Sequence, residues 1–140
     1  MNPQTDTDGR LRHLLTLDGL PRAELERLLD RAQALAADAC GGTALRHVLA
    51  GKAVCTLFFE PSTRTRSSVS LAAQRLGADL LNFDASSAST TKGEADLDTL
   101  KTLEAMGVQA FVVRHKRDGA VADLAAAAAP GTVLLNAGDG

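Results

Sequence analysis

Hydrophobic residues along the chain follow two different spacings. Short, nearly continuous apolar runs alternate with longer stretches in which apolar residues recur every three or four positions. The first spacing is typical of buried strands and the second of amphipathic helices. Strands are therefore predicted at residues 53–59, 79–83, 110–114 and 132–136. Helices are predicted between them and end near a glycine or a proline, at residues 63–76, 94–106 and 118–129.

The order of these elements predicts an α/β fold. Strands that alternate with helices through short turns form right-handed βαβ units, so we expect a parallel four-stranded sheet flanked by helices. One more amphipathic helix precedes the sheet, from Pro21 to just before Gly41. Its apolar positions are Leu25, Leu28, Leu29, Ala32, Leu35 and Ala36. Residues 1–10 are polar and are predicted to be a flexible N-terminus, with one domain over residues 11–140.

Composition narrows the possible functions. A net charge of −2 shows no basic excess for nucleic acid or an anionic membrane, and the four Phe with no Trp or Tyr offer few stacking platforms for bases. The two cysteines, Cys40 and Cys55, lack the spacing of a metal site, which favours reduced thiols and a cytoplasmic location. Neither a signal peptide nor a membrane span is expected from the polar start and the short apolar runs.

The turn after the first predicted strand carries the strongest chemical signal. Pro61 ends the strand, and Ser62 or Thr63 can cap the helix that follows. Arg64 and Arg66 then fall in the first helical turn, where the helix dipole disfavours cations. Free backbone N–H groups, hydroxyls and guanidiniums at one helix start favour an anion site, most simply for phosphate. The alternative is an ordinary cap with the arginines turned to solvent.

The other strands end in similar groups. Hydroxyl residues from Ser86 to Thr91 and the cation Lys92 follow the second strand, Arg114 and His115 end the third, and residues 136–140 end the fourth. Ligands of open α/β sheets bind at the carboxyl ends of the strands, so this convergence favours an anion site over solvated loops. The sequence contains neither a Walker phosphate loop nor a G-x-G-x-x-G fingerprint.

Four blocks of this sequence resemble the aspartate/ornithine carbamoyltransferase family. They stand in the family's order and spacing, at residues 58–66, 92–94, 112–115 and 136–140. The resemblance extends from about Leu11, and Lys92 is similar to the aspartate branch rather than the ornithine branch. It implies that residues 11–140 form a carbamoyl-phosphate-binding domain that is incomplete at its C-terminus.

The resemblance also implies roles for individual residues. The positions that match the family's carbamoyl-phosphate ligands are Ser62, Thr63, Arg64, Thr65 and Arg114. Arg64 would stabilise the leaving phosphate, while Thr65 and Arg114 would polarise the carbamoyl oxygen. Lys92 would reach the aspartate site of a neighbouring subunit, and Glu60 would tie two domains together on closure.

The implied reaction is a carbamoyl transfer. The amine of L-aspartate takes the carbamoyl group of carbamoyl phosphate to give N-carbamoyl-L-aspartate and phosphate, a step of pyrimidine biosynthesis. The family implies a cytoplasmic homotrimer that needs no cofactor and no metal, with no nucleic-acid or membrane partner. Ornithine carbamoyltransferase is one alternative, and a phosphate-binding or structural paralogue without catalysis is another.

Three departures from the family pattern affect this interpretation. The sequence stops at Gly140, before the His-Pro-Thr-Gln block and the amine-binding domain of the family, so these 140 residues are predicted to be inactive alone. Ala88 stands where the family has a serine on the phosphate. Val69 and Ser70 replace a Phe-Glu pair.

Overall fold

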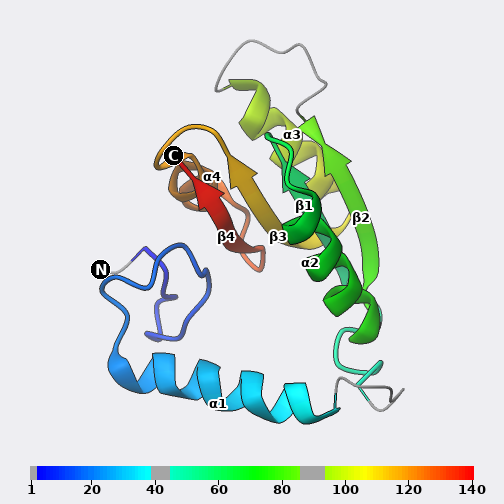
Figure 1. Cartoon of the computed structure of the whole chain (residues 1–140). Coiled ribbons are helices and arrows are strands. Elements are labelled where there is room, and N and C mark those ends of the chain that lie inside the picture. Colours follow the sequence, from blue (N-terminus) through cyan, green and yellow to red (C-terminus); the bar gives the residue numbers. More distant parts are fainter. Residues whose placement is uncertain (1–2, 39–44, 86–93) are drawn as a thin grey trace.

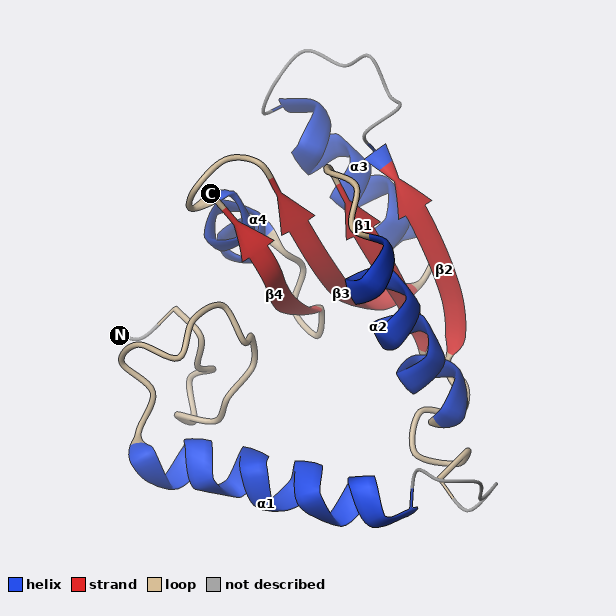
Figure 2. Ribbon diagram, in the orientation of Figure 1, coloured by secondary structure: helices blue, strands red, loops and turns tan. Residues whose placement is uncertain are grey.

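A parallel sheet of four strands forms the centre of the molecule, as the computed structural model shows (Figures 1 and 2). The structure describes residues 3–38, 45–85 and 94–140. The strands lie in the order β2-β1-β3-β4. Their bounds are Ala53–Phe58 for β1, Asp79–Asp84 for β2, Val108–His115 for β3 and Val133–Asp139 for β4. The predicted α/β fold and parallel sheet are therefore confirmed.

Four helices are described, of which three cover the two faces of this sheet and the first lies apart from it. They are α1 (Arg22–Asp38), α2 (Thr63–Arg75), α3 (Glu94–Ala105) and α4 (Ala120–Ala127). In Figure 1, α2 covers one face over β1 and β2, while α3 and α4 lie behind the sheet on the other face. Most boundaries agree with the sequence prediction within two residues. The exception is β4, which continues three residues beyond the predicted end.

The main core lies between the sheet and the helices α3 and α4. Alternate residues of β1 and β3 point to this side, because successive side chains of a strand face opposite ways. Fully buried residues of this core include Leu57, Phe111, Val113, Leu100 and Leu134. Cys55 belongs to the same cluster, and burial raises the pKa of its thiol to about 12. The thiol stays protonated at neutral pH, so Cys55 packs as a small apolar residue.

A polar network holds α2 on the opposite face. Asn82 of β2 accepts two hydrogen bonds at Oδ1, from Thr56 Oγ1 at 2.6 Å and from Ser70 Oγ at 2.9 Å. The hydroxyls thus connect the central strand, its neighbour and the helix. Ser70, one of the departures from the family pattern, has a packing role here that fits its small size.

The turn after α2 requires glycine. Gly77 adopts a φ of +84°, and a Cβ built on it would lie 1.8 Å from the backbone oxygen of Arg46. Its N–H donates to the carbonyl of Gln74, which closes the helix end. The predicted glycine cap of this helix is confirmed.

The segment before α1 pairs with the edge of the sheet. Leu14 forms a parallel bridge with Leu135: its N–H donates to Leu134 O at 2.9 Å, and its carbonyl accepts from Asn136 N at 2.8 Å. The buried side chain of Gln4 stabilises this segment, because its Oε1 accepts the N–H of Leu15 at 2.6 Å. This pairing covers the exposed edge of β4. The flexibility proposed for residues 1–10 stays a prediction, but the described part of that segment makes specific contacts.

Two side chains fasten this segment to the sheet. Arg12 donates from Nη2 to Ala129 O at 2.7 Å, and His13 Nδ1 accepts the N–H of Leu134 at 3.1 Å. His13 is buried, and burial, aided by the charge of Arg12, lowers its pKa below 6.5. His13 therefore acts in its neutral form.

Helix α1 extends away from the sheet (Figure 1). Its apolar stripe is open to solvent: Leu29 is 69% exposed, and Leu25, Leu28 and Leu35 are only half-buried. The sequence correctly predicted an amphipathic helix, but no described element packs tightly on its apolar side. None of the described helices combines the length and apolar character needed to cross a membrane.

The histidine contact predicts an acid-sensitive fold. Because the folded state lowers the pKa of His13, its stabilising contribution is complete above the unfolded value of 6.5 and is lost as the pH falls below it. We expect His13→Asn, which keeps an acceptor but cannot titrate, to lose less stability on acidification than the parent chain. Urea unfolding at about pH 7.5 and about pH 5 measures this difference. His47→Asn, at an exposed histidine, serves as the control and should behave like the parent. Equal acid sensitivity in His13→Asn and the parent would contradict the role of His13.

Candidate anion site at the carboxyl edge of the sheet

The start of α2 has the properties of an anion-binding helix terminus. Ser62 is the N-cap residue, with a φ of −154°, but no side chain forms a capping hydrogen bond in the part of the chain described here. No acidic residue lies in the first turn. The N–H groups of this turn, together with the hydroxyls of Ser62, Thr63 and Thr65, are thus left to bind an anion.

The two arginines of this first turn have different surroundings. Arg66 is turned back onto the fold: its Nη1 lies 3.2 Å from Asp84 Oδ2, and its guanidinium lies 5.0 Å from the ring centre of Phe58. Arg64 is exposed and forms no ion pair with any described residue. The sequence pattern placed both arginines at one anion site. The structure corrects this for Arg66, whose partner Asp84 ends β2 and could have been recognised as an acid at the same edge.

Arg114 lies at the end of the neighbouring strand. Phe58 and Arg114 are register partners across β1 and β3, so the turn after β1 begins beside Arg114. The Nη1 of Arg114 donates to Ala137 O at 2.9 Å. Its Nε lies 2.6 Å from Oε1 of Glu60, but the N–H does not point at that oxygen, so the contact is a charge pair rather than a hydrogen bond.

The guanidinium of Arg114 packs directly on the backbone at the end of β4. A Cβ built on Gly138 would lie 2.5 Å from Nη1 of Arg114, so only glycine allows this close approach. Asn136 fixes the turn, because its Oδ1 accepts the N–H of Gly138 at 2.8 Å and its Nδ2 donates to Asp139 at 2.7 Å. Asp139 also accepts the N–H of Val121 in the first turn of α4 at 3.4 Å. The sequence analysis placed these residues at the edge but missed this supporting role.

The predicted site residues divide into three groups. The structure brings Glu60, Ser62–Thr65 and Arg114 to one edge of the sheet. His115 is the last residue of β3, next to Arg114, but its side chain lies on the opposite face of the sheet and contacts Asp96 of α3. Lys92, Ala88 and the hydroxyl residues from Ser86 to Thr91 lie outside the described residues, as does Cys40. Among described residues, no group of His, Cys, Asp and Glu is arranged to hold a metal ion.

Comparison with known sequences shows the family. The sequence profile described as "Aspartate/ornithine carbamoyltransferase, carbamoyl-P binding domain" matches residues 12–140. The chain therefore belongs to the aspartate/ornithine carbamoyltransferase family. It is 71% identical over 137 residues to the aspartate carbamoyltransferase catalytic subunit of Xanthomonas campestris pv. campestris (strain B100), covering 98% of this chain and 44% of that protein. The corresponding protein of Stenotrophomonas maltophilia (strain R551-3) is 69% identical, with the same coverage.

Solved structures agree with this assignment. The catalytic subunit of M. jannaschii aspartate transcarbamoylase matches with a TM-score of 0.77 and 30% identity, over 93% of this chain and 42% of that one. Ornithine carbamoyltransferase from Thermus thermophilus matches with a TM-score of 0.76 and 31% identity, over 91% and 42%. The Trypanosoma cruzi aspartate transcarbamoylase, in complex with carbamoyl aspartate and phosphate, matches with a TM-score of 0.76 and 34% identity, over 92% and 41%. The present chain thus spans less than half the length of these relatives.

The close approach at Gly138 predicts a specific defect. Gly138→Ala should displace the Arg114 guanidinium from Ala137 O, because the new methyl group would occupy its place. Gly131→Ala is the matched control: its φ of +90° is also positive, yet nothing lies within 4 Å of the added Cβ. Both variants should lose about 1–3 kcal/mol of stability from backbone strain. A crystal structure of each decides, and an unmoved Arg114 in Gly138→Ala would contradict the argument.

Proposed function

We propose that this chain is the carbamoyl-phosphate-binding part of an aspartate carbamoyltransferase. One observation carries the proposal: the uncapped first turn of α2, with exposed Arg64, lies beside Arg114 at the carboxyl edge of the sheet. A phosphate and a neighbouring carbonyl need this combination of groups. Membership in the family and the high identity to aspartate carbamoyltransferase catalytic subunits support the choice of ligand.

The phosphate part of the ligand would bind at α2. Backbone N–H groups of the first turn and the hydroxyls of Ser62, Thr63 and Thr65 would donate to its oxygens. Arg64 would add a charge-assisted contact that strengthens as the phosphate leaves with its extra negative charge. Asp84 keeps Arg66 out of this role.

The carbamoyl part would point toward Arg114. The amine of L-aspartate attacks the carbamoyl carbon, the bond from that carbon to the phosphate oxygen breaks, and the amine loses a proton. Arg114 and Thr65 would stabilise the negative charge that develops on the carbamoyl oxygen. Much of the rate gain would come from holding the two reactants in place.

Glu60 would have two partners during the reaction. It now pairs with Arg114, and both side chains are about one third exposed or less. Domain closure, the role that the family implies for Glu60, would require it to leave Arg114 as the carbamoyl oxygen arrives. Arg114 would then exchange its contact with the carboxylate of Glu60 for a contact with the substrate.

The remaining parts of the proposal concern the whole protein. Lys92 would serve the aspartate site of a neighbouring subunit in a cytoplasmic homotrimer, and the pathway would be pyrimidine biosynthesis. No cofactor is proposed. The fold does not discriminate against ornithine carbamoyltransferase, because an ornithine enzyme matches it as well as the aspartate enzymes do. The identity of about 70% to the aspartate enzymes favours aspartate.

The role of Arg64 can be tested by binding. Arg64→Ala should weaken the affinity for phosphate by about ten- to a hundred-fold, since a charge-assisted contact contributes roughly 1.5–3 kcal/mol. Arg75→Ala removes an exposed arginine from the last turn of the same helix and should leave the affinity unchanged. Isothermal titration of both variants and the parent with inorganic phosphate gives the answer. Equal affinities for Arg64→Ala and the parent would rule out this phosphate site.

We also expect the 140-residue chain to be inactive alone and prone to association. The chain spans 44% of such a relative, and in this proposal most of the pocket for the amine would lie in the remaining part. The open apolar stripe of α1, with Leu29 and the neighbouring Leu17 each more than 60% exposed, favours self-association. A carbamoyl-aspartate assay beside sedimentation of the same sample measures both properties. Turnover from a clean monomer, at the rate of a full-length relative, would refute this expectation.

A further inference from the structure

The residue after Arg114, His115, is held from three sides. Its Nε2 lies 3.1 Å from Oδ2 of Asp96 in α3, and its Nδ1 accepts the backbone N–H of Arg117 at 2.9 Å. Its ring packs on Phe59 with 4.8 Å between the ring centres. Because Nδ1 accepts a hydrogen bond, the ring proton is on Nε2, and His115 donates to Asp96. Both side chains of this pair are less than one fifth exposed.

The backbone of Arg114 depends on its neighbours for its direction. The register between β3 and β4 shifts between Val113 and His115, so two residues of β4 lie opposite Arg114 alone. The extra residue is in β4, so β4 is the strand that bends there, and the bulged pair Ala137 and Gly138 includes the carbonyl that accepts from the Arg114 guanidinium. Pairing resumes at His115, and the carbonyl of Arg114 accepts the N–H of Phe59, the residue whose ring packs on His115, at 2.8 Å.

We propose that Asp96 and His115 are a positioning pair for Arg114, and this inference rests on the proposed function. Asp96 fixes the ring of His115, and His115 fixes the point at which β3 resumes its pairing with β4 beyond the bulge. The position of the backbone at His115 in turn determines how the Arg114 guanidinium is oriented. The pair acts through the strand and does not touch the ligand. It therefore sets the affinity for the carbonyl part of the ligand and leaves the phosphate part, bound at α2, unaffected.

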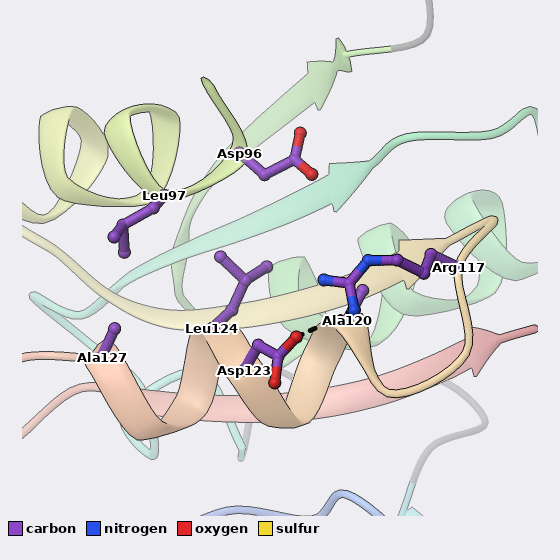
Figure 3. A pocket seen from close by; sticks show the side chains of 7 residues that line it. All are labelled: Asp96, Leu97, Arg117, Ala120, Asp123, Leu124 and Ala127. Carbon is purple, nitrogen blue, oxygen red and sulfur yellow. Dashed lines mark hydrogen bonds and ion pairs between the residues drawn. The ribbon is translucent and has the colours of Figure 1, made fainter. Parts of the chain in front are cut away.

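The surroundings of Asp96 supply a matched control. Its carboxylate borders a pocket of about 250 Å³ between α3 and α4, so its removal leaves no closed cavity (Figure 3). Asp123 lines the same pocket, with its Oδ2 2.8 Å from Nη1 of Arg117, and in the described structure it makes no contact with His115. Asp123→Ala therefore removes a carboxylate from the same pocket without disturbing the pair.

Two phosphonates separate the carbonyl contact from the phosphate contact. Phosphonoacetamide carries a carboxamide carbonyl and methylphosphonate does not. In calorimetric titrations, Asp96→Ala should weaken binding of phosphonoacetamide by about tenfold and of methylphosphonate by less than about twofold. Asp96→Asn, whose amide oxygen still accepts from His115, should recover most of the affinity, and Asp123→Ala should match the parent. Equal losses for both ligands, or no loss for either, would overturn the inference.

A measurement without ligand distinguishes failure of this inference from failure of the proposed function. The Nε–H signal of Arg114 in a ¹⁵N–¹H spectrum, assigned from its absence in Arg114→Lys, should shift in Asp96→Ala and stay in place in Asp123→Ala. An unchanged signal in Asp96→Ala overturns the positioning role, whatever the chain binds. If the parent chain binds neither phosphonate, the proposed function fails, and the spectrum still decides for or against the pair.

Discussion

The parallel pairing of β1 with β3 is the constraint on which the candidate site depends. It places Phe58 opposite Arg114, so the turn that carries Glu60 and the start of α2 emerge beside the end of β3. Five consecutive residues of β1 are buried, so both of its faces are covered, and a slip by one position would exchange the apolar side chains of the main core with those that face α2. The stability of the core thus fixes the relative position of the phosphate-binding turn and the carbonyl-binding arginine.

The three described arginines at this edge have three different environments. Arg66 is taken by Asp84 and Phe58, Arg114 is shared by Glu60 and the carbonyl of Ala137, and Arg64 alone is exposed. An edge with three unpaired arginines would repel itself and destabilise the fold in the absence of ligand. Internal carboxylates allow the cations to be present before the anion binds.

Much of this architecture could be predicted from the sequence. The apolar runs and glycine turns gave the strands, helices and their order, because those signals are local. The separation of Arg64 from Arg66 could not be predicted, since it depends on Asp84, a residue on another strand. The close approach of Arg114 to Gly138 and the contact of Asp96 with His115 were missed for the same reason, because each joins residues distant in sequence. Helix α1 was correctly predicted from its periodicity, but periodicity does not show what covers its apolar stripe.

The attachment of the N-terminal segment to β4 has a consequence for the order of folding during synthesis. The bond between His13 and Leu134 joins residues 121 positions apart. The ribosome must therefore complete the chain as far as Leu134 to Asn136, in the first half of β4, before this segment can dock. Until then the residues before α1 have no partner while the inner strands pair, so chaperone contact is most needed in that interval. The segment that is synthesised first is therefore among the last to find its place in the sheet.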